Sequence, residues 1–262
     1  MKTHVANHPL IAHKLTLLRD KNTDSPTFRH LTEELVMLLA YEATREIRTE
    51  KASIETPVAP MTGVHLSKPR PIVVPILRAG LGMLDGFLNI LPEASVAHVG
   101  LARNEDTLQP ECYYHKSPEH IAEADIIVLD PMLATGGSAC AAIEALKQQG
   151  AKHLVFVCMV AAPEGVNAIN LAHPDVTVYY PALDNRLNEH GYILPGLGDA
   201  GDRIFGTCID GEAELLGMEG GRRMSIREQM AFPFTEGWKA IRERWGREPG
   251  RIGRSVNDQF GQ

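Results

Sequence analysis

The chain alternates between short apolar runs and segments with helical periodicity. Residues 126–129, 154–160 and 176–180 are dominated by apolar side chains and are too short for buried helices, so each predicts a buried strand. Between the first two runs, Ile143 and Leu146 recur at helical spacing. Strands that are apolar throughout and alternate with helices are typical of a parallel sheet covered on both faces. The pattern therefore predicts an α/β fold with a mostly parallel central sheet flanked by helices.

Two more regions carry secondary-structure signals in the N-terminal half. A helix is expected to begin at Ser25 and Pro26, because serine is a good helix cap and proline is tolerated in the first turn. Residues 72–77 predict a buried strand, although the internal Pro75 cannot donate a hydrogen bond to a neighbouring strand. Residues 94–101 predict a further strand.

Composition places the chain among ordinary globular proteins. Its 262 residues are 44% hydrophobic and 23% charged, which excludes global disorder and suits one large domain or one domain with an appendage. The net charge of -7 argues against nonspecific binding to nucleic acid or to an anionic membrane as the main function. The longest apolar run, residues 154–162, has nine residues, far fewer than the roughly 20 that span a bilayer. The N-terminus shows no signal peptide, so we expect a cytoplasmic protein without a membrane partner.

The cysteine spacing predicts no metal or redox site. Cys112, Cys140, Cys158 and Cys208 form no CxxC pair, which argues against a zinc ribbon or a thioredoxin-like motif. Reduced thiols in a cytoplasmic protein are the simpler interpretation.

A change in composition near residue 207 suggests a boundary. Residues 208–262 contain both tryptophans and nine of the 23 glycines, and their nine basic residues balance nine acidic ones. The preceding part therefore carries the whole net charge. We predict one domain in residues 1–207 and a C-terminal extension of unknown role, mostly loop, with one short helix at 236–245.

A loop with two adjacent glycines joins the strand at 126–129 to the helix that follows. In Thr135-Gly136-Gly137-Ser138 the glycines allow a ligand to approach the backbone, and successive N–H groups at a helix start can cradle an anion. The two hydroxyls can donate as well, so a phosphate monoester fits these donors. No lysine follows the glycines, which argues against a Walker A nucleotide triphosphatase. The alternative is a plain strand-to-helix turn.

Asp130 lies five residues before Thr135, at the expected end of the strand. Ligands of parallel α/β sheets bind outside the carboxyl ends of the strands. A carboxylate at this point could accept hydrogen bonds from the vicinal hydroxyls of a sugar whose phosphate occupies the glycine loop. Pro131 favours an extended backbone at Asp130. The alternative is a turn residue that precedes a proline.

Four segments, taken together, resemble one enzyme family. The sequence DPMLATGGS at 130–138 resembles the phosphoribosyl diphosphate loop of type I phosphoribosyltransferases, and specifically that of uracil phosphoribosyltransferases. Residues 74–83 resemble the diphosphate-contacting loop of that family, residues 100–107 its second arginine segment, and residues 188–203 its uracil-binding hood. The motifs occur in one register, and the resemblance covers about residues 5–207.

The resemblance implies the type I phosphoribosyltransferase fold, with a small hood at about 182–207 that binds the base. It implies that the glycine loop holds the 5-phosphate of 5-phospho-α-D-ribose 1-diphosphate (PRPP) and that Asp130 accepts from the ribose hydroxyls. Arg78 and Arg103 would neutralise the diphosphate leaving group. The implied PRPP-binding residues are Arg78, Arg103, Asp130, Pro131, Met132, Leu133, Ala134, Thr135, Gly136, Gly137, Ser138 and Asp199.

The implied base site must separate uracil from cytosine, which has an amino group at C4 and no N3–H donor. Backbone amides and carbonyls suit this task because their polarity cannot rotate away. The resemblance places uracil on Ile193, Gly198, Asp199 and Ala200. By spacing alone, the same segment could be a metal-binding or hairpin turn. The implied catalytic residues are Arg78, Asp130 and Asp199.

The reaction that the resemblance implies is a step of pyrimidine salvage. The phosphoribosyl group of PRPP is transferred to N1 of uracil, which gives uridine monophosphate (UMP) and diphosphate. Mg²⁺ is expected on the diphosphate oxygens, and because this ion keeps several waters no dedicated protein site is required. A homo-oligomer, dimer or larger, is expected, and GTP is a candidate activator because it activates some relatives. Residues 104–118 resemble a flexible arm near the active site, although an ordinary exposed loop explains them as well.

Two other functions compete with this one. A regulatory protein of the same fold could sense nucleotides and bind RNA, but it would need a basic face, which the acidic balance of residues 1–207 disfavours. Transfer to hypoxanthine or xanthine is disfavoured by the hood motif GYILPGLGDAGDR at 191–203, which closely resembles the uracil-selective form.

Overall fold

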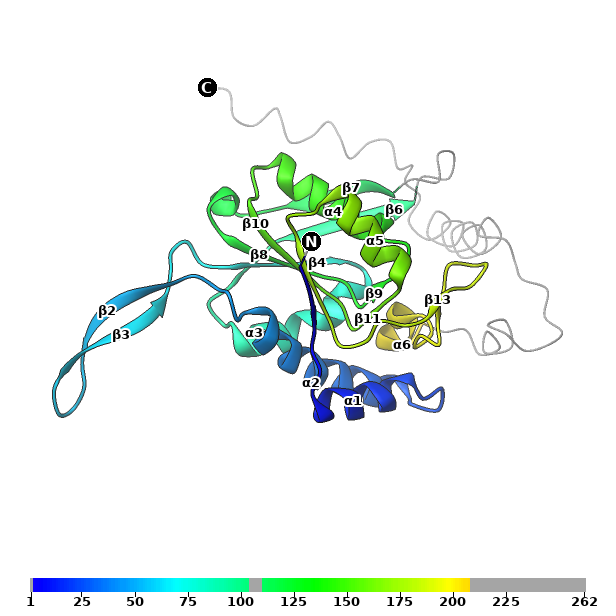
Figure 1. The fold of residues 1–262 in the computed structure, drawn as a ribbon, viewed down its shortest axis with the longest axis horizontal. Coiled ribbons are helices and arrows are strands. Elements are labelled where there is room, and N and C mark those ends of the chain that lie inside the picture. The colour runs from blue at the N-terminus through cyan, green and yellow to red at the C-terminus, as the bar shows by residue number, and fades with distance from the viewer. Residues whose placement is uncertain (1, 104–109, 208–262) are drawn as a thin grey trace, which may run out of the picture. The chain divides into compact units, whose positions relative to one another are not determined.

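The computed structural model describes residues 2–103 and 110–207 (Figure 1). Its central sheet has eight strands, in the order β1-β12-β10-β8-β4-β6-β7, with β5 also paired to β4. Every pairing in this sheet is parallel except that of β6 with β7. The predicted α/β fold with a mostly parallel sheet is confirmed. The strands are β1 (Thr3–Val5), β4 (Ile72–Leu77), β5 (Ser95–Val96), β6 (His98–Arg103), β7 (Pro110–Lys116), β8 (Asp125–Leu129), β10 (His153–Val157) and β12 (Thr177–Tyr180).

Helices cover both faces of this sheet (Figure 1). Successive residues of a strand point to opposite faces, so the residues of β8 enter two separate cores. Ile127 and Leu129 pack with α1, α2 and α3, whereas Ile126 and Val128 pack with α4 and α5. The helices are α1 (Pro9–Arg19), α2 (Ser25–Ala43), α3 (Leu84–Ile90), α4 (Gly137–Gln148), α5 (Pro163–Ala172) and α6 (Ala200–Phe205), with short 3₁₀ helices η1 (Ala79–Met83) and η2 (Glu119–Ala122).

Helix α2 begins at the predicted residue, but the predicted cap is wrong. Asp24, not Ser25, caps the helix and accepts a hydrogen bond from the Thr27 N–H at 2.9 Å. A carboxylate at this position satisfies an N–H group that has no helical partner. The hydrogen bond with Thr27 lowers the pKa of Asp24.

Pro75 is accommodated in the middle of the sheet because the neighbouring strand is interrupted beside it. The strand predicted at 94–101 is two strands, β5 and β6, separated by Ala97. β5 pairs with the residues before Pro75, and β6 pairs with those after it. The missing N–H of the proline therefore lies beside a gap in the hydrogen-bond ladder. The run at 154–160 is likewise divided, into β10 and β11 (Val160–Ala161).

Within the described parts of the chain, three small two-stranded sheets lie outside the central one. β11 pairs in parallel with β9 (Met132–Leu133), and β13 (Arg186–Leu187) pairs antiparallel with β14 (Ile193–Leu194). β2 (Thr49–Glu55) and β3 (Pro60–Leu66) form an antiparallel hairpin that stands away from the central sheet (Figure 1). No residue of either hairpin strand is buried, so no apolar alternation in the sequence predicted it.

Two further expectations concern membrane crossing and the C-terminal segment. Within residues 2–103 and 110–207, no helix combines the length and the apolar character that a bilayer crossing requires. The short helix expected at 236–245 lies outside the described residues.

Candidate active site

Two loops meet at the carboxyl ends of adjacent parallel strands. Arg78 directly follows β4, Asp130 directly follows β8, and the two strands pair in parallel up to Pro75 and Leu129. Gly80 lies against the end of β8, because a Cβ at this position would be 2.5 Å from the Leu129 carbonyl oxygen. Only glycine permits this approach, and it brings the loop that carries Arg78 to the loop that carries Asp130.

The glycine loop turns from β9 directly into α4. Gly136 has a φ of +84°, and a Cβ there would lie 2.7 Å from the Cβ of Ala168, so both conformation and packing require glycine. α4 begins at Gly137, and its first N–H groups have no helical carbonyl as a partner. The Gly137 N–H lies 3.4 Å from Thr135 Oγ1, and the side chains of Thr135 and Ser138 are exposed. These donors can receive a tetrahedral anion.

Helix α5 packs closely against the backbone of the glycine loop and supports it. A Cβ on Gly165 would lie 2.5 Å from the carbonyl oxygen of Ala134 and 2.8 Å from that of Leu133. Pro131 and Leu133 are buried, and Met132 and Ala134 are half-buried. These four residues therefore shape the loop mainly through their backbone. The sequence did not single out Gly165, because only the approach of two distant segments reveals its role.

The carboxyl group of Asp130 is largely withdrawn from water, while the residue as a whole is half-buried. Burial raises the pKa of Asp130 from its ordinary value of 3.8 to about 7, while the Met132 N–H, 3.4 Å from Oδ1, acts in the opposite direction. Cys158, which directly follows the neighbouring strand β10, is fully buried. Burial, and secondarily the charge of Asp130, raises the pKa of its thiol. A carboxyl group with such a pKa at a strand end is typical of functional sites.

The segment predicted as the hood offers mainly backbone groups. The turn after β14 is tight, since a Cβ on Gly196 would overlap the Ile193 carbonyl oxygen. Ile193 and Ala200 are buried and belong to the hydrophobic core. Gly198 has a φ of +79° and no side chain. Three of the four predicted base-contacting residues have no polar side-chain atom, so their only hydrogen-bonding groups are backbone N–H and C=O.

Asp199 and Arg78 come together between the hood and the end of β4. Asp199 caps α6 by accepting a hydrogen bond from the Asp202 N–H at 2.9 Å. A Cβ on Gly201 would lie 3.3 Å from Asp199 Oδ1 and 3.5 Å from Arg78 Nη2, so both side chains lie over this glycine. Arg78 Nη2 also donates to Asp202 Oδ1 at 2.7 Å, and the guanidinium carbon lies 5.6 Å from the centre of the Phe205 ring.

Arg103 is the last residue of β6. Its side chain lies outside the described part of the structure, so its role stays a prediction. Of the arm expected at 104–118, residues 104–109 also lie outside the described ranges. Most of the remainder is not a loop, because Pro110–Lys116 forms β7 and pairs with β6.

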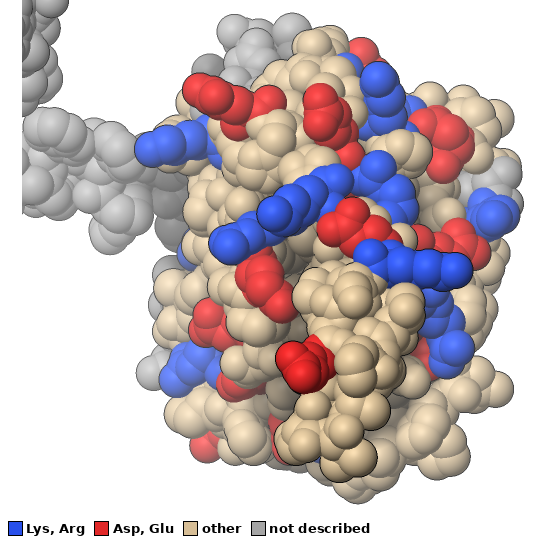
Figure 2. Space-filling model, turned by 90° about the vertical axis from the view of Figure 1, so that its left-hand side faces the viewer, with Lys and Arg blue, Asp and Glu red and all other residues tan. Residues whose placement is uncertain are grey.

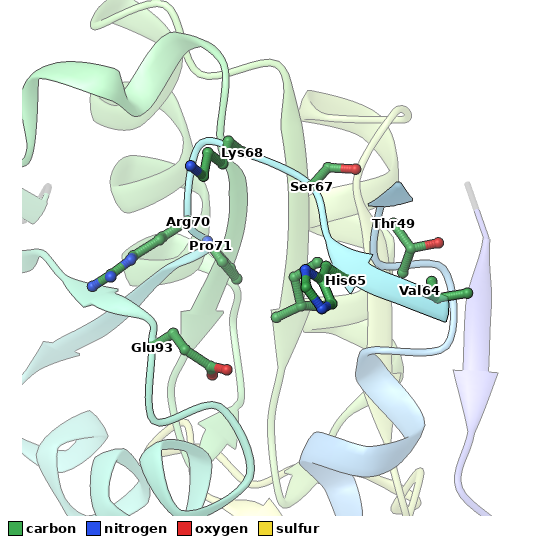
Figure 3. Close-up of a pocket in the computed structure, with 9 residues that line it drawn as sticks. Thr49, Val64, His65, Ser67, Lys68, Arg70, Pro71 and Glu93 are labelled. Carbon is green, nitrogen blue, oxygen red and sulfur yellow. The ribbon is translucent and has the colours of Figure 1, made fainter. Parts of the chain in front are cut away.

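A cavity of about 530 Å³ lies at the opposite end of β4 (Figure 3). Its lining includes Pro71, directly before β4, and the charged residues Lys68, Arg70 and Glu93. Arg78 follows the other end of this six-residue strand, roughly 20 Å away at the usual rise per residue. The cavity contains none of the predicted site residues, so we assign it no part in the candidate active site.

The sequence profile described as Uracil phosphoribosyltransferase matches residues 5–207. The chain belongs to the uracil phosphoribosyltransferase family. The family that the four motifs predicted is thereby confirmed. The match ends at residue 207, so residues 208–262 lie outside it.

Individual members of the uracil phosphoribosyltransferase family are similar over their full length. The uracil phosphoribosyltransferase of Streptomyces griseus subsp. griseus is 60% identical over 210 residues, which cover 79% of this chain and 100% of the relative. That of Clostridium beijerinckii is 60% identical over 201 residues, with 77% and 96% covered. A solved protein from Aquifex aeolicus has a TM-score of 0.74 and 37% identity, covering 79% of this chain and 99% of that one.

The fold extends to distant relatives. Adenine phosphoribosyl transferase from Trypanosoma brucei has a TM-score of 0.50 at 11% identity, with 88% of this chain and 95% of that chain covered. At this identity the similarity concerns the fold alone. The chain has the type I phosphoribosyltransferase fold that the motifs implied.

Two arginines to which the sequence assigned no role hold the hood of this family member. Arg19 donates to both carboxylate oxygens of Asp184, at 2.6 and 2.8 Å, and to the Gly196 carbonyl at 2.6 Å. Asp184 also accepts from the Gly196 N–H at 2.8 Å. The Arg203 guanidinium carbon lies 4.3 Å from the centre of the Phe28 ring. No sequence pattern marks the pair of Arg19 and Asp184, because the two residues are 165 positions apart.

Replacing Asp184 with alanine is expected to lower the free energy of unfolding by about 3 kcal/mol, because it leaves the Arg19 guanidinium and the Gly196 N–H without their shared acceptor. The Asp184 side chain is only 6% exposed, so water cannot fully replace the lost partner. Urea denaturation measures the change. Asp175→Ala is the control, since its ion pair with Lys147 involves a side chain that is 55% exposed, and such pairs contribute roughly 0–1 kcal/mol. Equal effects of the two substitutions would contradict the assigned role of Asp184.

Proposed function

We propose that this chain transfers the phosphoribosyl group of PRPP to N1 of uracil and releases UMP and diphosphate, as an enzyme of pyrimidine salvage. The proposal rests on one arrangement of groups. The glycine loop, a desolvated carboxyl group and an arginine converge at one edge of the sheet, beside a hood of backbone groups. Membership of the uracil phosphoribosyltransferase family supports the same substrates. We assign the activity to residues 1–207, and we treat residues 208–262 as a C-terminal extension.

The sugar phosphate is held by the loop from Asp130 to Ser138 in this proposal. The 5-phosphate accepts hydrogen bonds from the exposed hydroxyls of Thr135 and Ser138 and from the first N–H groups of α4. Asp130 accepts from the ribose hydroxyls, which supply the hydrogen bonds that burial denies to its carboxylate. The sugar is thereby fixed at both ends, with C1 directed toward the hood.

The diphosphate leaving group binds to Arg78 and Arg103. Its negative charge grows as the bond between C1 and the diphosphate oxygen breaks, and a cation that is already in place stabilises this charge without reorganisation. Arg78 donates to Asp202 through Nη2, and a guanidinium has further N–H donors on its other edges. The same arginine can therefore bind an anion while it stays anchored.

The base binds to the backbone of Ile193, Gly198 and Ala200 and to Asp199. Backbone N–H groups donate to the uracil carbonyl oxygens, and a backbone carbonyl accepts from N3–H. Cytosine would place its amino group against an N–H donor, and it has no N3–H for the carbonyl. Because the peptide groups cannot exchange donor for acceptor, this arrangement selects uracil.

The transfer itself is assisted mainly by positioning and by charge. The sugar passes through a state with oxocarbenium character as the diphosphate departs and N1 approaches C1. Asp199 lies beside Arg78 over Gly201, and its carboxylate is placed by capping α6. In the proposal this carboxylate orients the base or balances the positive charge of the sugar, and the fixed geometry reduces the entropic part of the barrier.

Mg²⁺ belongs to the proposal as an ion carried by the diphosphate. No group of three His, Cys, Asp or Glu side chains is arranged as a metal site within the described residues. The chemistry still fits, because Mg²⁺ is usually bound by substrate phosphates, waters and one or two carboxylates, and Asp130 and Asp199 supply carboxylates at this edge of the sheet. When bound, the ion would neutralise part of the charge of the leaving group.

One assay tests the proposed function. Uracil, PRPP and Mg²⁺ are incubated with the full chain, UMP is detected, and cytosine, hypoxanthine and xanthine are assayed in parallel. Product from uracil alone is the expected result. Product from a purine, or no product from any base by a folded protein, would overturn it. Adding GTP to the same assay tests whether it activates the enzyme. We also propose that the enzyme is cytoplasmic.

The charge distribution on one face of the molecule argues against the RNA-binding alternative. Figure 2 shows Lys and Arg side chains interspersed with Asp and Glu on this face, rather than a continuous basic surface. Several charged side chains of the described residues are paired, among them Arg48 with Asp125 at 2.9 Å. A salt-dependent shift of RNA in a gel by this protein would favour the alternative.

A homo-oligomer is part of the proposal, and the β2–β3 hairpin is its proposed contact. Val58 and Val64 are 94% and 66% exposed on a hairpin that the central sheet does not cover. An isolated hairpin is marginally stable, so a second copy that packs on it would stabilise it. We expect Val58→Asp combined with Val64→Asp to lower the molar mass in light scattering. Leu171→Asp, at a residue 75% exposed on α5, is the control, and an unchanged mass of the hairpin variant would contradict the contact.

A further inference from the structure

Asp202 connects the hood to the arginine at the end of β4. Its Oδ1 accepts from Arg78 Nη2 at 2.7 Å and from Thr207 Oγ1 at 2.6 Å. The two residues of the ion pair are 124 positions apart, and although each lies in one of the four motifs, the sequence did not suggest the contact between them. The ion pair therefore joins the segment proposed to bind the diphosphate to the segment proposed to bind the base.

The helix that carries Asp202 is well supported. The Asp202 N–H donates to the Asp199 cap, and the Ile204 carbonyl accepts from Arg29 Nη1 at 2.9 Å. Ile204 is buried and packs so closely on η1 that a Cβ on Gly82 would lie 2.7 Å from its Cδ1. The Asp202 carboxylate is thus presented from an element that the core holds in place, and its side chain is only 27% exposed.

Arg78, by contrast, has a side chain that is 57% exposed, and among the described residues its guanidinium has its polar and aromatic contacts with α6. Its guanidinium touches Asp202 at one nitrogen and lies over the Phe205 ring, with the carbon 5.6 Å from the ring centre. Both contacts come from α6. A long side chain that is free in solution loses conformational entropy when it binds a ligand, and an anchored one loses less. Asp202 and Phe205 therefore restrict Arg78 before any substrate arrives.

We propose that Asp202 is a positioning residue for the phosphoribosyl transfer, which holds the Arg78 guanidinium where it meets the diphosphate. Asp202 does not touch the substrate and acts only through Arg78. Because Asp199 caps the helix that carries Asp202, Asp202 also fixes the diphosphate-binding arginine relative to the base-binding hood. This inference rests on the proposed function, and it names a residue to which that function assigned no part.

If the ion pair of Arg78 and Asp202 served only to stabilise the fold, its loss would affect the melting temperature rather than the kinetics. Partly exposed ion pairs contribute little to folding stability, so the loss of this one is expected to leave the melting temperature almost unchanged. A misplaced arginine changes the reaction far more, because small errors in the position of a charged group near the reacting atoms can cost one to two powers of ten in rate. Measuring both the activity and the melting temperature therefore distinguishes a positioning role from a structural one.

The test is a double-mutant cycle on kcat and KM for both substrates. Asp202→Ala is expected to lower kcat/KM for PRPP roughly tenfold to hundredfold, with a smaller change in KM for uracil. In an Arg78→Ala background, Asp202→Ala is expected to have almost no further effect. Asp202→Asn should retain part of the activity, since the amide oxygen still accepts from Arg78. Asp175→Ala, which removes an ion pair of similar length with Lys147, is the control and should match the wild type.

Each outcome of this cycle bears on the inference. Additive effects of the two substitutions, or a faster enzyme in Asp202→Ala, would overturn it, because Asp202 would then act independently of Arg78 or restrain it. Thr207→Val covers the case in which Asp202→Ala does not fold, since it removes one hydrogen bond to Asp202 and should lower kcat/KM in the same direction. An inactive wild-type chain would count against the proposed function itself, which the uracil assay establishes first.

Discussion

Asp130→Asn is expected to remove most of the transferase activity and, in the free protein, to increase folding stability above pH 7. The substitution keeps the shape of the side chain but leaves a weaker acceptor for the ribose hydroxyls. At the same time it removes a carboxylate that the fold withdraws from water and that no ion pair compensates within the described residues. Activity and stability therefore move in opposite directions, which is typical of a functional group held in an unfavourable environment.

The sign of the stability effect follows from the direction of the pKa shift. Folding raises the pKa of Asp130 from 3.8 to about 7, so the native state binds the proton more tightly than the unfolded chain. Its stability contribution is fully present below pH 3.8 and is lost as the pH rises through 7. At pH 8 the buried carboxylate costs at most about 4 kcal/mol, since each pKa unit corresponds to roughly 1.4 kcal/mol. Asp130→Asn should abolish this dependence.

Urea denaturation between pH 4 and pH 8 measures the effect, with the uracil assay on the same variant. Asp175→Asn is the matched control with the opposite sign, because the hydrogen bond with Lys147 lowers the pKa of Asp175. That carboxylate stabilises the fold above its unfolded pKa, so its replacement should lower stability at neutral pH. The wild-type kcat/KM for PRPP should also fall as the pH drops below about 7, when Asp130 takes up its proton. Full activity of Asp130→Asn, or an unchanged pH dependence of stability, would contradict the role of this residue.

Arg78→Ala is expected to reduce kcat by about two to three powers of ten, the usual effect of removing one group that stabilises charge developing in the transition state. Stability should change by less than about 1 kcal/mol, because the guanidinium is 57% exposed and its ion pair with Asp202 is partly solvated. Arg78→Lys should recover only part of the loss. A lysine ammonium is a point charge, so it cannot bind Asp202 and the diphosphate at once with the geometry of the planar guanidinium.

Steady-state kinetics and thermal melting together check this expectation. The chain offers a close control in Arg45, which donates to Glu42 at 2.8 Å and lies 5.8 Å from the centre of the Tyr41 ring. Arg45→Ala removes an exposed arginine with an ion pair and an aromatic neighbour, as Arg78→Ala does, but at a different place in the fold. It should leave kcat unchanged. Comparable losses in both variants, or a folded Arg78→Ala enzyme with full activity, would show that Arg78 does not act on the diphosphate.

The sequence predicted the sheet well because the signals for buried parallel strands are local. Residues 126–129 and 72–77 are apolar throughout, and they become the adjacent strands β8 and β4. Interruptions were harder to predict. The break between β5 and β6 follows from the missing N–H of Pro75 on the neighbouring strand. The cap at Asp24 displaced the expected Ser25 because both residues can cap and only the backbone geometry decides between them.

The candidate site shows the same division. Motifs are short stretches of sequence, so the glycine loop and Asp130 could be recognised without a structure. Side chains that hold such motifs in place come from elsewhere in the chain and leave no local pattern. Gly165 under the glycine loop and Arg19 on Asp184 are of this kind. The roles of Arg103 and of residues 208–262 stay predictions.

The α/β class, the family and the candidate substrate-binding residues could be predicted without a structure, because hydrophobic periodicity and short motifs are local patterns in the sequence. Only the folded structure shows that the carboxyl group of Asp130 is desolvated and that Asp202 anchors Arg78. Desolvation depends on every element packed around a group, and an ion pair across 124 positions depends on where two segments meet. These properties arise only when distant parts of the chain are brought together, and they set the charge and the position of the groups proposed to act on the substrate.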